Sequence, residues 1–231
     1  RNAFARYYDL GDGKGAALVS ATPQHFANAA GQWEVADPRF STDEDGYVVR
    51  QNSLVSSLSA ATSAALIQRN QSALGWLPQA LLALDNTGQP IQTLAQPRQT
   101  ETENKATAQS TETSLSADGT TLTYRNHWDD ATLRETFVSG VGSIEQSLIL
   151  AEPPHVRGWR AAVPFATQPD ALALEAKLYL LSGEALWANG APQNKAFSTA
   201  GQADQHLTLR TAAGETVMTL APVFAYEQAN P

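Results

Sequence analysis

The chain of 231 residues contains no cysteine. This absence excludes disulfide bonds, thiolate catalysis and any zinc or iron–sulfur site that depends on cysteine ligands. A chain of this length buries roughly 70–75% of the surface that its unfolded form exposes, so a stable core needs no covalent cross-link. Length alone allows one domain or two, since all-β domains commonly reach this size as single units.

Charge is also scarce, at 16% of residues, and the balance of 15 basic against 23 acidic residues gives a net charge of −8. The largest basic group is Arg157-Gly158-Trp159-Arg160. Because nucleic-acid binding relies on lysine and arginine contacts to phosphate, we expect no nucleic-acid partner. No hydrophobic run approaches the ~20 residues that span a bilayer, and no signal-peptide pattern opens the sequence, so we also expect no membrane insertion.

The hydrophobic residues that are present alternate with a period of two. Between Leu172 and Leu180 the even-numbered residues form one apolar face of an extended strand. Alanine, leucine, glutamate and lysine also favour helices, which leaves a helix as the alternative there. Leu207 to Leu220 predicts a β-hairpin that turns at Ala212-Ala213-Gly214. The best helix candidate, Ser59 to Ile67, is short and has no apolar stripe.

Turn signals recur at short intervals along the chain. They are Asp12-Gly13, Gly31, Asp45-Gly46, Asn86-Thr87-Gly88, Asp118-Gly119, Gly140-Val141-Gly142, Ser182-Gly183, Asn189-Gly190 and Gly214. Many short strands separated by such turns indicate an all-β fold, a large antiparallel β-sandwich with few or no helices.

One compositional change divides the chain. From Gln96 to Ser114 threonine, glutamate and glutamine dominate, and the hydrophobic residues are Ala106 and Ala108. Such a segment cannot bury enough apolar surface to offset the entropy of ordering it. We therefore predict a single domain over 1–231, with strand-rich halves at 1–95 and 115–231 joined by an exposed polar loop over 96–114.

Two clusters carry groups that can do chemistry. Asp43-Glu44-Asp45-Gly46 offers oxygen ligands for a cation such as calcium, but the EF-hand spacing is absent, and a solvated acidic turn is the alternative. His127, Asp129 and Asp130 surround Trp128 and suggest an acid/base pair or a ligand set. Alternate residues of an extended segment point to opposite sides, so closeness in sequence does not make these three converge.

Other catalytic patterns are missing or uninformative. No Gly-x-Ser-x-Gly elbow is present, and the Gly11 to Gly15 loop lacks the phosphate-binding spacing. Carboxylates for glycoside hydrolysis are available, but their separation is a property of the folded chain; the candidates are Asp37, Glu135, Glu145 and Glu175. We predict no catalytic residues, no metal and no cofactor, and therefore no enzyme.

The tryptophans are the remaining candidates for a binding surface, because aromatic rings with a polar edge often line ligand sites. We assign sugar stacking to Trp76, Trp128, Trp159 and Trp187. The alternative is that each ring covers an end of the sandwich core.

Two blocks of the chain carry a family resemblance. The first block runs from Tyr7-Tyr8-Asp9-Leu10-Gly11-Asp12-Gly13 through Thr22-Pro23, Gly31-Gln32-Trp33-Glu34 and Asp37-Pro38 to Gly46-Tyr47, and the second joins Leu122 to Leu133 with Gly142 to Leu150. They resemble the amino-terminal, strand-rich module of large secreted bacterial surface proteins with RHS repeats or DNRLRE domains. In that family Tyr124, Asn126 and Trp128 match a Tyr-x-Asn-x-Trp corner between strands.

The resemblance implies a non-catalytic structural or presentation module near the amino terminus of a large secreted or cell-surface bacterial protein. The alternative is a module that binds a surface glycan or a partner protein. The implied partners are other domains of the same polypeptide, and we expect the parent to continue on both sides, with a signal peptide upstream.

Overall fold

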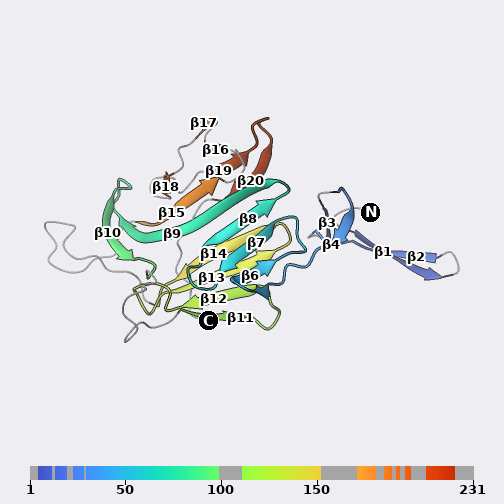
Figure 1. The fold of residues 1–231 in the computed structure, drawn as a ribbon, viewed down its shortest axis with the longest axis horizontal. Coiled ribbons are helices and arrows are strands. Elements are labelled where there is room, and N and C mark those ends of the chain that lie inside the picture. The colour runs from blue at the N-terminus through green and yellow to red at the C-terminus, as the bar shows by residue number, and fades with distance from the viewer. Residues whose placement is uncertain are drawn as a thin grey trace.

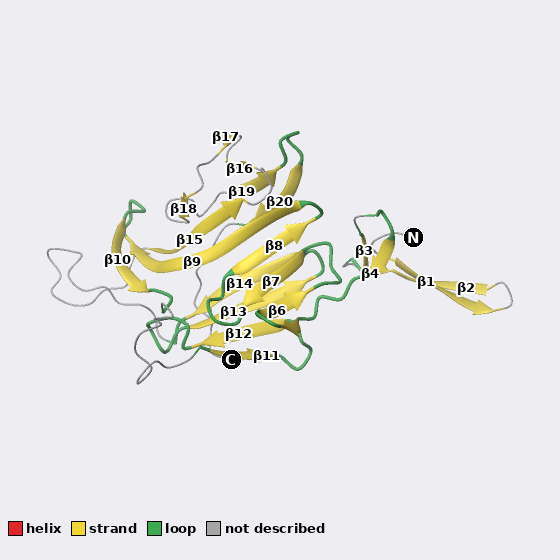
Figure 2. Ribbon diagram, viewed as in Figure 1, coloured by secondary structure: helices red, strands yellow, loops and turns green. Residues whose placement is uncertain are grey.

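The computed structural model describes residues 5–11, 14–19, 23–28, 30–98, 111–151, 171–180, 185–188, 191–192, 196–198 and 207–221. Over these ranges the chain forms strands and turns without any helix, which confirms the all-β prediction (Figure 2). All strand pairs are antiparallel. No helix in the described ranges is long and apolar enough to cross a membrane.

The largest sheet has eight strands in the order β18-β15-β9-β8-β7-β6-β5, and β10 pairs with β9 beside this path. Its strands are β5 (Ser41–Asp43), β6 (Gly46–Val49), β7 (Val55–Ser59), β8 (Ala65–Arg69), β9 (Ser72–Leu84), β10 (Pro90–Ala95), β15 (Ala171–Leu180) and β18 (Ala196–Ser198). The strand predicted over Leu172 to Leu180 is confirmed as β15, with Leu174, Ala176 and Leu178 buried.

Two four-stranded sheets pack against the eight-stranded sheet (Figure 1). One has the order β11-β12-β13-β14, with β11 (Glu112–Leu115), β12 (Thr121–Arg125), β13 (Arg134–Gly140) and β14 (Ser143–Ile149). The other has the order β17-β16-β19-β20, with β16 (Ala185–Ala188), β17 (Ala191–Pro192), β19 (Leu207–Arg210) and β20 (Thr216–Leu220). The pairing of β19 with β20 confirms the predicted hairpin.

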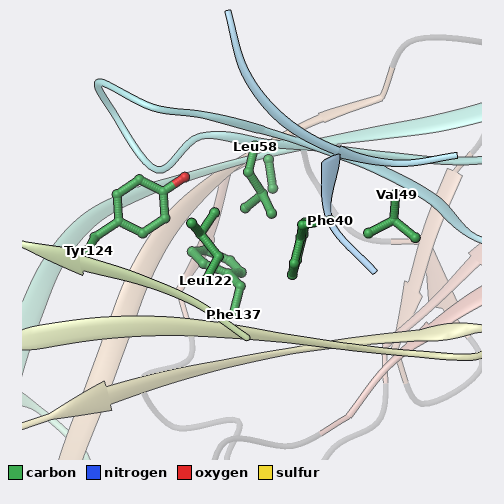
Figure 3. Close-up of a cluster of buried hydrophobic side chains, with 7 residues drawn as sticks. Phe40, Val49, Leu58, Leu122, Tyr124 and Phe137 are labelled. Carbon is green, nitrogen blue, oxygen red and sulfur yellow. The ribbon is translucent and has the colours of Figure 1, made fainter. Parts of the chain in front are cut away.

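The core between the eight-stranded sheet and β11–β14 is built from alternating residues of both. Leu58 of β7 and Val49 of β6 pack with Leu122 and Tyr124 of β12 and with Phe137 of β13 (Figure 3). A second cluster joins Leu74 and Leu178 of the large sheet to Leu207 and Leu209 of β19. Burial of such side chains stabilises the fold by roughly 1.5–3 kcal/mol each.

Two further hairpins lie at the amino-terminal end. They are formed by β1 (Ala5–Gly11) with β2 (Lys14–Val19), and by β3 (His25–Ala27) with β4 (Trp33–Val35). Within the described ranges each hairpin is a separate two-stranded sheet that pairs with no other strand. The β1–β2 hairpin extends away from the sandwich (Figure 1).

The weak helix candidate is not a helix, and one sequence prediction is wrong in detail. Ser59 to Ile67 covers the end of β7, the turn at 60–64 and the start of β8, and Ser56, Leu58 and Ala65 alternate into the core as strand residues do. The polar segment is not a loop up to Ser114, since β11 begins at Glu112 and pairs with β12. Residues 99–110 lie outside the described ranges.

Candidate functional site

A serine, a histidine and a glutamate meet inside the sandwich. Ser63 lies in the turn between β7 and β8, His127 follows β12, and Glu135 is the second residue of β13. Their exposed fractions are 0%, 1% and 0%. Polar groups as deeply buried as these require partners, because an unpaired one costs roughly 1–3 kcal/mol.

Hydrogen bonds join this buried cluster, which we call the Glu135 cluster and define as Ser63, His127, Trp128, Glu135 and Gln146. Ser63 Oγ lies 3.0 Å from His127 Nε2, which is 3.8 Å from Glu135 Oε2. Trp128 Nε1 donates to Glu135 Oε2 at 3.1 Å, and Gln146 Nε2 donates a short hydrogen bond to Oε1. Ser63 also hydrogen-bonds the carboxyl group, so three side chains bond Glu135.

Burial determines the charge of this cluster. It raises the pKa of Glu135 to about 7, although the hydrogen bonds from Ser63, Gln146 and Trp128 act in the opposite direction. Burial likewise lowers the pKa of His127 to about 4. In mildly acidic solution both groups are therefore neutral, and their contact is not an ion pair.

The chain places His127 and Trp128 inward through a corner after β12. Asn126 adopts a left-handed conformation with φ 56°, which asparagine tolerates better than most residues. The segment that follows β10 holds this corner in place. Arg98 N donates to His127 O and Arg98 Nε donates to Trp128 O, each at 2.8 Å. Tyr124 anchors the strand by donating from its hydroxyl to Ser59 O at 2.8 Å.

The Glu135 cluster does not have the geometry of a serine-hydrolase triad. In a triad the hydroxyl and the acid contact opposite nitrogens of the imidazole ring. Here both Ser63 and Glu135 lie on the Nε2 side, and Nδ1 has no hydrogen-bond partner within the described residues. Ser63, His127 and Glu135 are also buried, so an external substrate cannot reach the hydroxyl group.

The acid/base group suggested around Trp128 is not assembled. His127 points into the core, whereas Asp129 bonds the backbone of Gln96 and Asp130 caps the amide and hydroxyl of Thr132. This arrangement is a structural corner at Tyr124, Asn126 and Trp128.

The four tryptophans assigned to sugar stacking lie in different environments. Trp128 is 0% exposed and offers no ring face to a sugar, so stacking on it is excluded in this fold. Trp76 lies in the middle of β9 and packs against three hydrophobic clusters. Trp187 lies in β16, and Trp159 is outside the described ranges. Trp33, which we did not assign, is 37% exposed in β4.

The acidic turn forms the connection between β5 and β6. Asp43 pairs with Arg50 and accepts a hydrogen bond from the amide of Glu44, so its carboxylate is already engaged. Within the described residues no three histidine, cysteine or acidic side chains gather as metal ligands do.

Comparisons with protein-family models, with curated proteins and with solved structures find no significant match to this chain. Fold and site together define an all-β sandwich domain with a sealed polar cluster in its core. Sequence reasoning considered Glu135 and His127 separately but missed Ser63 and Gln146. Their contacts join residues 64 and 11 positions apart, and no local pattern announces them.

Proposed function

We propose that this domain is a non-catalytic structural and presentation module of a large secreted or cell-surface bacterial protein. The observation that carries the proposal is the position of its reactive groups. Ser63, His127 and Glu135 are buried, so the cluster can stabilise the fold but cannot receive a substrate from solution. A domain whose chemistry is sealed in its core acts on its surroundings through its shape and surface.

The arrangement of the sheets also supports a presentation role. In the described ranges, clusters of hydrophobic side chains are buried between the eight-stranded sheet and the two sheets packed on it. The two amino-terminal hairpins extend outward (Figure 1), and they carry exposed Val19, Trp33 and Val35. Isolated two-stranded hairpins are only marginally stable in water, which fits elements that contact neighbouring domains of a longer polypeptide.

Surface labelling of the parent protein tests this proposal. An epitope inserted at the exposed β19–β20 turn, between Ala212 and Ala213, leaves the strand pairs intact. We expect antibody labelling of intact cells without permeabilisation. Labelling that requires permeabilised cells would contradict a surface location, and a cytoplasmic marker protein serves as the control for cell integrity.

A glycan- or partner-binding module is the second candidate, and exposed aromatic surface on β4 favours it. Trp33 and Val35 lie two residues apart on this strand and are both exposed. The loop before them is held by Asn28, whose Oδ1 accepts the amides of Ala30 and Gln32 and whose Nδ2 donates to Glu34. A hairpin that carries an exposed indole offers a stacking surface for a sugar ring.

A glycan array with the wild type, Trp33→Ala and Tyr179→Ala separates the two functions. Tyr179 is an exposed aromatic residue of β15, remote in sequence from the hairpin, and provides the matched control. The presentation role predicts no saturable binding by any of the three proteins. Saturable binding that Trp33→Ala abolishes and Tyr179→Ala preserves would establish the binding role instead.

A further inference from the structure

The Glu135 cluster contains all the groups required to form a covalent cross-link. Ser63 supplies a hydroxyl, Gln146 a carboxamide, His127 an imidazole nitrogen and Glu135 a buried carboxyl. Ser63 contacts His127, which lies beside the Glu135 carboxyl group, and Gln146 donates to the same carboxyl group, so the fold brings the nucleophile and the electrophile into one network. No hydrolytic substrate can enter, but a reaction between side chains already inside the core needs no entry path.

We propose that Ser63 and Gln146 become joined by an intramolecular ester bond, with His127 as the base and Glu135 as the acid. The base and the acid each contact the atom on which they act. Nε2 of His127 lies 3.0 Å from the attacking Oγ, and the carboxyl of Glu135 contacts the nitrogen that leaves. A positioned base and acid each typically accelerate proton transfer by 10²–10⁴-fold, as an order of magnitude.

The reaction balances without any oxidant or cofactor. Ser63 Oγ forms a bond to Gln146 Cδ while the bond from Cδ to Nε2 breaks. The proton of Oγ passes to His127 Nε2, and the carboxyl proton of Glu135 passes to the leaving nitrogen, which departs as ammonia. The imidazole then returns its proton to the Glu135 carboxylate, 3.8 Å away, so both helpers are regenerated.

The protonation states suit this division of roles. Burial raises the pKa of Glu135 to about 7, so the carboxyl holds a proton in mildly acidic solution and about half of the molecules still hold it at neutral pH. Burial lowers the pKa of His127 to about 4, so its ring is neutral there and can accept a proton. Trp128 Nε1 fixes the carboxyl through Oε2 and leaves Oε1 directed at Gln146.

The surroundings favour ester formation over hydrolysis. The buried positions of Ser63, His127 and Glu135 and the half-buried position of Gln146 limit the access of water, which would otherwise compete as nucleophile and cleave the product. Ser63 has φ 46°, a left-handed backbone conformation that costs roughly 1–3 kcal/mol outside functional sites and is found disproportionately within them. The Ser63 hydroxyl contacts the His127 imidazole from this backbone position.

The ester would connect the two packed sheets. Ser63 belongs to the β7–β8 turn of the eight-stranded sheet, and Gln146 belongs to β14, the last strand of the four-stranded sheet. In a chain without cysteine, such a bond would resist unfolding as a disulfide does. This inference rests on the core geometry alone and holds whatever the location of the parent protein.

Intact-mass measurement of the folded wild-type domain tests the bond directly. We expect the mass to fall below that of the sequence by one ammonia during incubation at neutral pH. Trypsin should then release residues 51–69 and 135–157 as one joined peptide, which hydroxylamine separates because it cleaves esters. Ser57→Ala in β7 should keep the cross-link, and Ser63→Ala should lose it.

The outcomes that overturn the proposal are equally defined. A folded wild-type protein that keeps its full mass after prolonged incubation refutes the ester, and so does an ammonia loss that persists in Ser63→Ala. Glu135→Gln keeps the size of the side chain but cannot supply the proton. It should form the cross-link about 100-fold more slowly or worse, and an unchanged rate would refute the role of Glu135.

Discussion

Glu135 is buried and accepts hydrogen bonds from Trp128 and Gln146, and its burial determines how stability depends on pH. Its folded pKa, about 7, lies above the usual value of 4.5 because burial penalises the charged form. A raised folded pKa contributes stability that is complete below the unfolded pKa and is lost as pH rises through the folded one. His127 has the opposite shift, so its contribution is present above pH 6.5 and lost as pH falls through about 4.

We therefore predict that the free energy of unfolding has a flat maximum between about pH 4.5 and 6.5, where the falling contribution of Glu135 and the rising contribution of His127 offset each other. Above this range it falls by roughly 1 kcal/mol because of Glu135. Urea unfolding between pH 4 and 9 measures this profile. The test compares Ser63→Ala with Ser63→Ala/Glu135→Gln, since neither protein can form the ester. The alkaline decline should disappear in the double variant, and its persistence would assign the decline to another group.

At the scale of elements, one asparagine links the two packed sheets at their edge. Asn52 precedes β7 and is buried, and its Nδ2 donates to Gly140 O while its Oδ1 accepts from Gly142 N, each at 2.7 Å. These two backbone groups belong to the turn between β13 and β14. The side chain therefore fixes the position of that hairpin relative to the large sheet.

We predict that Asn52→Ala destabilises the domain by about 2–4 kcal/mol, because it leaves a carbonyl and an amide of the turn without partners. Chemical denaturation measures the loss. Gln51→Ala is the matched control, since this neighbouring side chain is exposed and its change should stay within about 0.5 kcal/mol. Equal losses for both variants would show that the clamp contributes nothing specific.

The β5–β6 hairpin depends on a close approach to β7. A Cβ at Gly46 would lie 2.0 Å from Leu58 O, a backbone atom that cannot turn aside, whereas a Cβ at Gly214 meets open space. We predict that Gly46→Ala lowers stability by at least about 2 kcal/mol, and that Gly214→Ala costs about 1 kcal/mol from its positive φ. Thermal unfolding of the two variants checks this order, and the reverse order would contradict the packing at Gly46.

Elements with a clean period of two could be predicted from sequence, and elements with a break in that period could not. β15 alternates because one face is buried and the other is largely exposed. In β9 the residues facing the core change from Leu74 and Trp76 to Leu81, because a bulge at Gln79 inserts one residue opposite β15. The Glu135 cluster was equally hidden, since it depends on contacts between distant strands rather than on a motif.

At the scale of the whole molecule, the predicted halves 1–95 and 115–231 are joined through the large sheet. All of β15, which belongs to the second half, pairs with β9 of the first half, from Ala171↔Leu84 to Leu180↔Leu74. The cluster around Leu122 and Phe137 further buries side chains from both halves. Separating the halves would expose this core and break an entire strand ladder.

We predict that cutting the chain between the halves leaves one folded particle. A protease site placed between Asn104 and Lys105 allows cleavage after folding, at a position between the strands β10 and β11. In Ser63→Ala, which cannot form the ester, the two fragments should elute together in size-exclusion chromatography and separate only in denaturant, because the β9–β15 pairing and the shared core do not depend on this connection. Two separate folded species after cleavage would mean that each half is a domain of its own, and would place the boundary within 96–114.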